Sequence, residues 1–266
     1  MTAGGTAAEG FAQPAYPHVC HSHARFRPDC RNCKARLVSF CAHLDAEGLE
    51  RLGALTTSRL YAKGTVIFEQ GMVLDHVMVI IEGLVRLYQL LPDGRRQVTG
   101  FLGTGDLMGG LKRSDGAHCT AQAITDVIAC TVGRKAFLGL LETYPQLAFG
   151  LLFTATDEIE AQQDHIVLLG RKTLEERLAA FLLLYSERWQ THEHNGTAIH
   201  LPMTRADIAD YLGLTVESIS RTFTRFRKEG LIEMPSSSEI LVRNLPALYA
   251  KAGFDEVPRR GAMLGL

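Results

Sequence analysis

The sequence predicts an α+β protein made of a β-roll (jelly roll), a long helix and a C-terminal winged helix-turn-helix domain. Three stretches carry this prediction. Residues 60–140 contain short runs of β-forming residues separated by glycines, residues 145–170 have the periodicity of one long helix, and residues 203–230 have the caps and the turn glycine of two short helices. Strands grouped apart from helices are typical of the α+β class.

Length and composition fit a protein of two modest domains and a connector, at 266 residues. We expect a flexible tail over 1–28, a cysteine-bearing segment over 29–43, the β-roll over 44–142, a dimerisation helix over 143–170, the winged helix-turn-helix over 171–250 and a tail over 251–266. The composition, 46% hydrophobic and 21% charged, is that of a soluble globular protein. Neither a signal peptide nor an apolar run of about 20 residues is evident, so we expect a cytoplasmic protein without a membrane segment.

The β-roll prediction depends on several short β-runs and one turn. Pro92-Asp93-Gly94 is a hairpin-turn sequence. A β-run spans Val127–Thr131, and Leu44 to Leu55 predicts a short amphipathic helix ahead of the strands. The other strand candidates are Thr65–Phe68, His76–Ile81, Leu84–Leu91 and Gln97–Phe101.

The long helix is predicted to begin at Pro145 and end near Gly170. Side chains at alternating steps of three and four residues form an a/d seam, the pattern of a two-stranded coiled coil: Leu152, Ala155, Ile159, Gln162, Ile166 and Leu169. The alanine and the glutamine make this seam weak, although a polar core pair fixes register. The helix either forms a dimer seam or packs on its own domain, and a palindromic DNA site favours the dimer.

Residues 203–230 predict a DNA-binding helix-turn-helix. Thr204 with Asp207 forms a capping box, Gly213 ends the first helix, and Thr215 caps the second. A wing hairpin is predicted after the second helix, with a turn at Pro235–Ser238 between two short β-runs, Leu231–Glu233 and Glu239–Val242. The alternative is an ordinary helical hairpin with a solvated charged face.

The outward face of the second helix carries the candidate DNA-binding residues Val216, Glu217, Ser220, Arg221 and Arg225. An arginine donates two hydrogen bonds to guanine, a glutamate accepts one from cytosine, and a valine contacts a thymine methyl group. We expect Thr222 and Arg225 to contact phosphates. The net charge is only −1, so binding must come from this local basic patch.

The cysteine spacing Cys30-x2-Cys33-x7-Cys41 predicts a metal centre, with Cys130 as a fourth ligand. Four thiolates suit a [4Fe-4S] cluster and tetrahedral zinc equally well. Cys119 is the competing fourth ligand, and Cys20 lies in the predicted tail. The remaining alternative is a set of free thiols.

The chain resembles the Crp/Fnr regulators over about residues 30–250. The recognition-helix motif Glu-x-x-Ser-Arg stands here as Glu217-Ser218-Ile219-Ser220-Arg221, the string Glu-Glu-Arg-Leu-Ala-Ala-Phe follows Leu174, and the run 63–71 looks like the start of the family's cyclic-nucleotide-binding-like β-roll. The resemblance implies a homodimer that binds double-stranded DNA at TTGAT-N4-ATCAA, acts as an activator with RNA polymerase as partner, and is not an enzyme.

The cysteines resemble those of FNR-type oxygen-responsive regulators, which carry three before the β-roll and one within it. The x7 gap departs from the enteric spacing and resembles the FnrN/FnrL type. The resemblance implies a [4Fe-4S] cluster and control of anaerobic or microaerobic genes. A cyclic nucleotide is not expected, because glycine replaces the ribose-binding glutamate in 105–114. The alternative is a cluster-free regulator that senses thiol redox state or a small-molecule ligand.

Overall fold

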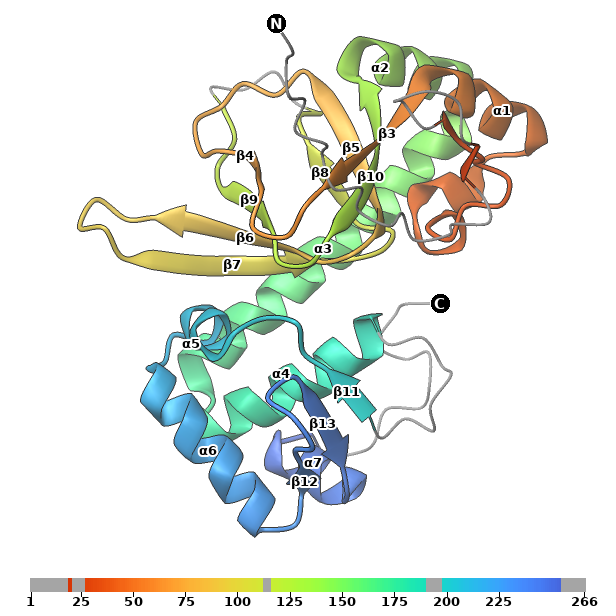
Figure 1. Ribbon diagram of the computed structural model, residues 1–266. Coiled ribbons are helices and arrows are strands. Elements are labelled where there is room, and N and C mark those ends of the chain that lie inside the picture. The colour runs from red at the N-terminus through yellow and green to blue at the C-terminus, as the bar shows by residue number, and fades with distance from the viewer. Residues whose placement is uncertain (1–18, 21–26, 112–115, 190–197, 255–266) are drawn as a thin grey trace, which may run out of the picture.

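The computed structural model describes residues 19–20, 27–111, 116–189 and 198–254. Within these, two antiparallel four-stranded sheets form the predicted β-roll (Figure 1). One sheet has the order β3-β10-β5-β8 and the other β4-β9-β6-β7. The strands are β3 (Thr56–Tyr61), β4 (Val66–Phe68), β5 (His76–Glu82), β6 (Val85–Leu90), β7 (Arg96–Leu102), β8 (Leu107–Gly109), β9 (Thr120–Ala123) and β10 (Val127–Gly133).

The space between the sheets is filled by side chains that alternate along the strands, such as Met78 and Ile80 of β5 and Val127 and Ala129 of β10. This alternation follows from the two-residue period of a strand. The turn at Pro92-Asp93-Gly94 is confirmed: Gly94 has a φ of 82°, and its N–H donates to the Leu91 carbonyl to close the β6–β7 hairpin.

The N-terminal segment folds into two short 3-10 helices ahead of the predicted amphipathic helix α1 (Ala46–Leu55). They are η1 (Arg36–Val38) and η2 (Phe40–His43). Two strand pieces, β1 (Val19–Cys20) and β2 (Arg27–Pro28), pair with each other in the part of the chain predicted as a tail. Residues 1–18, 21–26 and 255–266 of the two predicted tails lie outside the described residues.

Helix α2 (Arg134–Thr143) and the long helix α3 (Pro145–Arg171) follow the β-roll and are bent by 113° relative to each other. No single helix in the described ranges is long and apolar enough to span a membrane, although this bent pair meets the length and composition limits together. Phe137 and Leu140 of α2 and Leu147 of α3 lie buried in one cluster with the cysteine segment.

The C-terminal domain contains α4 (Leu174–Trp189), α5 (Arg205–Leu212), α6 (Val216–Lys228) and α7 (Leu245–Lys251), with a small sheet in the order β11-β13-β12. Its strands are β11 (Ala198–His200), β12 (Ile232–Glu233) and β13 (Glu239–Val242). The predicted caps are confirmed: Thr204 and Asp207 form a capping box, Gly213 ends α5 with a φ of 64°, and Thr215 caps α6.

Candidate thiol centre and DNA-reading face

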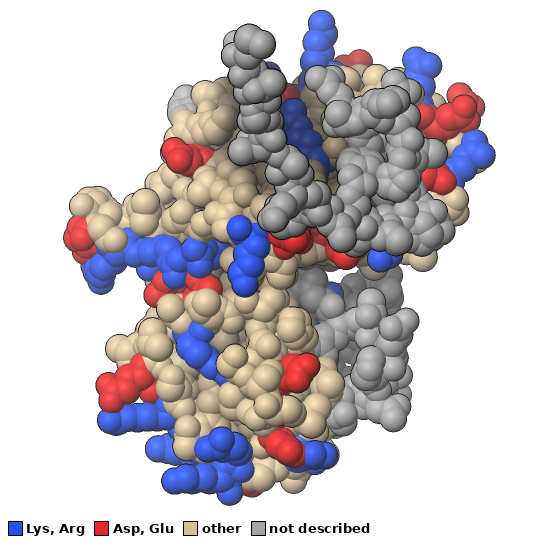
Figure 2. Space-filling model, in the orientation of Figure 1, with Lys and Arg blue, Asp and Glu red and all other residues tan. Residues whose placement is uncertain are grey.

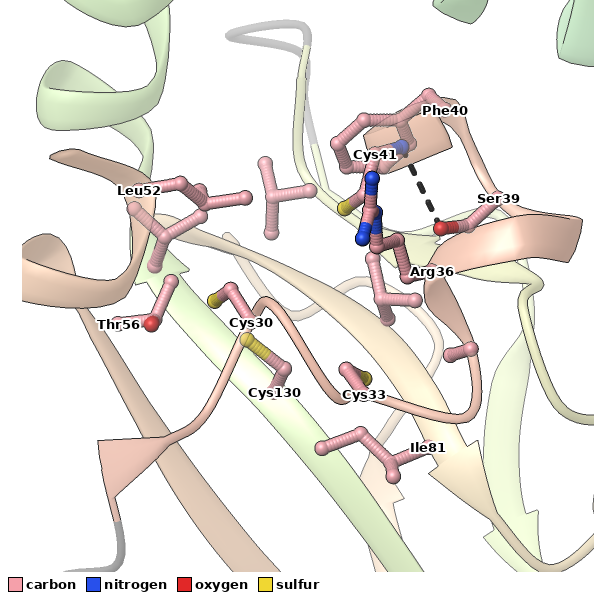
Figure 3. A pocket seen from close by; sticks show the side chains of 14 residues that line it. Cys30, Cys33, Arg36, Ser39, Phe40, Cys41, Leu52, Thr56, Ile81 and Cys130 are labelled. Atoms are coloured by element: carbon pink, nitrogen blue, oxygen red, sulfur yellow. Dashed lines mark hydrogen bonds between the residues drawn. The ribbon is translucent and has the colours of Figure 1, made fainter. Parts of the chain in front are cut away.

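Four thiols from two distant parts of the chain line one cavity in the N-terminal domain (Figure 3). Cys30, Cys33 and Cys41 come from the segment that contains η1 and η2. Cys130 comes from β10, the strand between β3 and β5. Cys119 is not among the lining residues, because it packs half-buried inside the β-roll. The side chain of Cys20 lies outside the described residues.

Local hydrogen bonds hold the cysteine segment in place. Asp29 accepts from the backbone N–H of Arg31 at 3.0 Å and from the Asn32 amide at 2.8 Å, which turns the chain at Cys30. The carbonyl of Cys33 accepts from the N–H of Arg36, and Ser39 caps η2 by accepting from the N–H of Cys41. These contacts are short-range, so the segment's own sequence determines this loop.

The walls of the cavity are apolar, formed among others by Val77 and Val79 of β5, Val132 of β10 and Leu52 of α1. Burial, together with the neighbouring thiols, raises the pKa of Cys30 to about 12. Burial raises the pKa of Cys41 to about 11 and that of Cys130 further. Four such thiols ionise together only if a positively charged centre compensates their charges.

Arg36 also lines this cavity (Figure 3). The Nη1 atom donates to the carbonyl of Arg31 at 3.1 Å, but the Nε atom is buried without a hydrogen-bond partner among the described residues. A buried donor without an acceptor is costly in a folded protein. One residue that lines the cavity therefore carries an unsatisfied buried donor.

The donor set has the chemistry of an iron–sulfur or zinc site, since it is all sulfur. In the described part of the chain, however, no group of three or more His, Cys, Asp or Glu side chains converges as the ligands of a single metal ion do. The four cysteines line the same cavity, which is all that the described residues show of this site.

The cysteine segment is also in contact with the long helix. Helix η2 packs on α3 at Gly150, where a β-carbon would lie 2.4 Å from Cδ2 of His43 and 3.2 Å from the carbonyl oxygen of Phe40. The ring of His43 lies 6.1 Å from that of Phe153, one turn further along α3. The segment that carries Cys41 thus rests directly on the helix predicted to form the dimer.

The predicted seam side chains Leu152, Ala155, Ile159, Gln162 and Ile166 are exposed on α3, with Leu152, Ile159 and Ile166 at 60%, 58% and 68%. Leu169 departs from the prediction, because it is half-buried against the core of its own DNA-binding domain. Three exposed apolar residues were missed: Phe149, Phe153 and Val167. The apolar face is therefore broader than the seam of alternating steps.

Helix α6 presents the predicted DNA-binding residues outward, while Ile219, Phe223 and Phe226 are buried. Glu217 and Arg221 form an ion pair at 2.6 Å, with side chains 72% and 78% exposed, and Val216 and Ser220 are exposed beside them. Arg225 pairs with Glu175 of α4. Figure 2 shows Lys and Arg side chains gathered at the end of the molecule where α6 lies.

One prediction for α6 was wrong. Thr222 was expected to contact phosphate, but it is buried and its hydroxyl donates to the carbonyl of Ser218 at 2.8 Å. Its place between Ile219 and Phe226 at steps of three and four was a signal for burial. Sequence reasoning also missed Arg205, whose guanidinium lies 3.5 Å from the ring centre of Phe223 and donates to the carbonyl of Ser237 in the wing.

Comparison with known proteins places both domains. Residues 58–144 match the family described as "Cyclic nucleotide-binding domain", and residues 176–251 match "Crp-like helix-turn-helix domain". Over 203 residues the chain is 38% identical to the nitrogen fixation regulation protein FixK of Bradyrhizobium diazoefficiens, covering 76% of this chain and 85% of that one. The chain belongs to the Crp/Fnr family.

Other Crp/Fnr proteins match over similar spans. The transcriptional activator protein FnrL of Cereibacter sphaeroides is 33% identical, covering 85% of this chain and 92% of its own. The fumarate and nitrate reduction regulatory protein of Salmonella typhimurium is also 33% identical, covering 84% and 90%. The structure of FixK2 from Bradyrhizobium japonicum has a TM-score of 0.68 at 33% identity, covering 77% of this chain and 99% of that one. These Crp/Fnr relatives are transcription regulators and not enzymes.

Proposed function

We propose that this Crp/Fnr protein is an oxygen-responsive transcription activator. It would hold a [4Fe-4S] cluster on Cys30, Cys33, Cys41 and Cys130, dimerise at low oxygen and bind TTGAT-N4-ATCAA sites to control anaerobic or microaerobic genes with RNA polymerase. The observation that carries this proposal is the single apolar cavity lined by these four thiols, which come from two separate parts of the chain.

The residues around the cavity support the cluster. Four thiolates suit a [4Fe-4S] cluster as well as zinc, and the resemblance of their spacing to that of the FNR-type regulators favours the cluster. The buried Nε of Arg36 has no acceptor within the described ranges, and a cluster sulfur within reach would accept its hydrogen bond. The lining residues include no histidine, aspartate or glutamate that would compete with the thiols as a ligand.

When bound, the cluster would link the N-terminal segment to β10, and this link would be lost when oxygen destroys the cluster. The position of this segment would affect α3 through η2, because η2 packs on α3 at Gly150. With the segment docked, α3 presents its exposed apolar face to a second copy of the chain. A seam that contains Ala155 and Gln162 is weak enough for a coupling of about 1–3 kcal/mol to decide association.

The dimer would place two copies of α6 about 34 Å apart, one helical turn of DNA. Arg221 would donate to guanine and Glu217 would accept from cytosine, while Val216 meets a thymine methyl group. The ion pair between Glu217 and Arg221 holds both side chains on the same outward face before DNA arrives. Arg225 would exchange Glu175 for a phosphate.

The proposal is tested by iron and sulfide analysis of protein purified without oxygen. Replacing Cys30, Cys33, Cys41 or Cys130 by Ser should abolish the iron chromophore and DNA binding, whereas Cys20→Ser and Cys119→Ser should leave both intact. A full iron content in Cys130→Ser would overturn the assignment of the fourth ligand. Iron-free protein whose DNA binding responds to thiol oxidants would instead support the cluster-free regulator.

Cyclic-nucleotide binding is not favoured by the structure around Gly105. A β-carbon at Gly105 would lie 2.5 Å from the carbonyl oxygen of Val38, so η1 covers this turn. The next residue, Asp106, pairs with Arg188 of α4 at 3.1 Å. We therefore expect added cyclic AMP to leave DNA affinity unchanged in a gel-shift assay.

A further inference from the structure

The β6–β7 hairpin of the sensory domain packs against α5, the first helix of the helix-turn-helix, within the same chain (Figure 1). Arg96 of β7 pairs with Asp207 at 3.0 Å and with Asp210 at 2.6 Å. Arg86 of β6 pairs with Asp207, and the Gln97 amide donates to the carbonyl of Asp210. Two arginines on two strands thus hold two aspartates one helical turn apart.

These contacts are well ordered by their surroundings. Asp207 is only 1% exposed, and it also accepts from the backbone N–H and hydroxyl of Thr204, so it holds the start of α5. Arg86 donates to the amide oxygen of Gln122 at 2.6 Å, and both arginines lie over the ring of Tyr88. Partners on three sides leave the arginines little rotamer freedom, which strengthens an ion pair.

An aromatic group continues the contact beside the ion pairs. Tyr211 of α5 packs against Phe101 of β7 with ring centres 5.3 Å apart, and stacks on His165 of α3 at 4.1 Å. Phe181 of α4 lies 5.7 Å from the same ring. The sensory domain, the long helix and the DNA-binding domain therefore meet at one side of α5.

Covalently, the DNA-binding domain is joined to α3 only by the two residues between Arg171 and Leu174. The non-covalent contacts must therefore set the orientation of α6 relative to the dimer helix. The contact between the hairpin and α5 leaves Glu217, Ser220 and Arg221 exposed, so it does not cover the DNA-reading face. It fixes the orientation of α6 before DNA binds, which reduces the conformational entropy lost when the dimer binds two half-sites.

We propose that Arg86 and Arg96 are positioning residues for DNA binding that determine which half-site spacing the dimer accepts. The inference rests on the proposed binding to a palindrome. A rigidly held pair of α6 helices fits one separation of half-sites, whereas a pair released at the two-residue connection fits several. The hairpin arginines would act through α5 and would not touch DNA.

The test compares anaerobically purified wild type with Arg96→Ala on duplexes whose half-sites are separated by 3, 4, 5 or 6 base pairs. Wild type should prefer four base pairs. Arg96→Ala should reduce that preference by on the order of fivefold, because binding to the four-base-pair site weakens more than binding to the others. Arg95→Ala is the matched control on the same hairpin, since Arg95 pairs with Asp93 near the turn.

The double variant Arg96→Ala with Asp210→Ala tests whether the effect comes from this ion pair. It should reduce the spacing preference no more than Arg96→Ala alone, because both substitutions remove the same contact. Trypsin should cut Arg96→Ala faster than wild type at Arg171 or Lys172, the connection between α3 and α4, and the double variant should be cut as fast as Arg96→Ala.

Three results would overturn the inference: equal weakening at all spacings in Arg96→Ala, a further loss of preference in the double variant, or unchanged trypsin cleavage. A wild type that binds no palindrome under anaerobic conditions would refute the proposed function instead. The trypsin comparison would still test the contact between the hairpin and α5 in that case, since it needs no DNA.

Discussion

Gly150 of the long helix lies so close to His43 that a β-carbon on it would stand 2.4 Å from the Cδ2 atom of the imidazole. This contact joins the segment that carries Cys41 to the helix whose apolar face is exposed. Because glycine is normally unfavourable inside a helix, close packing is the physical reason for having it here. The contact connects the segment that lines the thiol cavity with the helix that carries the proposed dimer face.

Gly150→Ala should therefore displace η2 from α3 and weaken dimerisation in anaerobic protein. We expect a destabilisation of about 1–3 kcal/mol, the usual cost of overpacking, which exceeds the gain in helix propensity. Sedimentation velocity and urea unfolding measure the two effects.

Gly170→Ala is the control for Gly150→Ala, because nothing lies within 4 Å of a β-carbon at Gly170 in the same helix. The double variant Gly150→Ala with His43→Ala removes the atom that clashes and should recover dimerisation. If Gly150→Ala dimerises as wild type does, the contact does not couple the segment to α3.

Arg36 should stabilise the proposed cluster against air. Arg36→Met removes the buried Nε donor, so the visible absorbance of anaerobic protein should decay several-fold faster after oxygen is added. Arg31→Ala is the control, because the Arg31 side chain pairs with the exposed Glu50 at 3.0 Å outside the cavity. Equal decay rates for Arg36→Met and wild type would mean that the cluster accepts no hydrogen bond from Arg36.

Arg221 should read a guanine in the half-site. Arg221→Ala is expected to cost about 1–3 kcal/mol per half-site and to relax the preference at that base. Arg225→Ala should instead weaken binding to all sequences alike and reduce its salt dependence, as loss of a phosphate contact does. Competition gel shifts with TTGAT and guanine-substituted sites distinguish the two, and unchanged discrimination by Arg221→Ala would refute its assignment.

Gln162→Leu should strengthen the dimer enough for DNA binding in air. A leucine buries apolar surface worth about 1.5–3 kcal/mol per side chain, so the two leucines of a dimer together exceed the contribution of about 1–3 kcal/mol expected from the cluster. Gln162 is exposed and its amide donates only to Glu158 at 2.8 Å among the bonds described, so the substitution disturbs little else. Sedimentation and gel shifts under air measure the effect.

Gln163→Leu, the neighbouring substitution, tests the register of that seam. If it drives dimerisation and Gln162→Leu does not, the seam is displaced by one residue toward the side of Phe149 and Val167. A monomer in air for both variants would mean that this face of α3 is not the dimer seam.

His165 should make the domain contact weaken as the pH falls. Burial lowers its pKa below the ordinary value of 6.5, since the ring stacks on Tyr211. Its contribution is fully present above pH 6.5, where the ring is neutral in both states, and is lost as the pH falls toward the folded-state pKa. The urea midpoint of aerobic wild type should therefore drop more between pH 7.5 and 5.5 than that of His165→Phe. Equal drops would show that His165 does not titrate with unfolding.

Local sequence signals determined the helix-turn-helix almost residue by residue. Thr204, Asp207, Gly213 and Thr215 act within three or four residues of their own positions, so a sequence pattern is enough to identify them. The strands and the long helix follow from periodicity in the same way. The cysteine content alone left Cys130 and Cys119 as candidates for the fourth ligand, and the family resemblance favoured Cys130.

The tertiary structure alone decided which side chains meet over long separations. Leu169 turned inward because the DNA-binding domain packs on the end of α3, and the apolar face widened to include Phe149 and Phe153 because no element of the same chain covers them among the described residues. The ion pairs of Arg86 and Arg96 with α5 join residues more than a hundred positions apart in the sequence, and no periodicity or spacing predicts them. Such contacts depend on how finished elements pack, which no local pattern in the chain encodes.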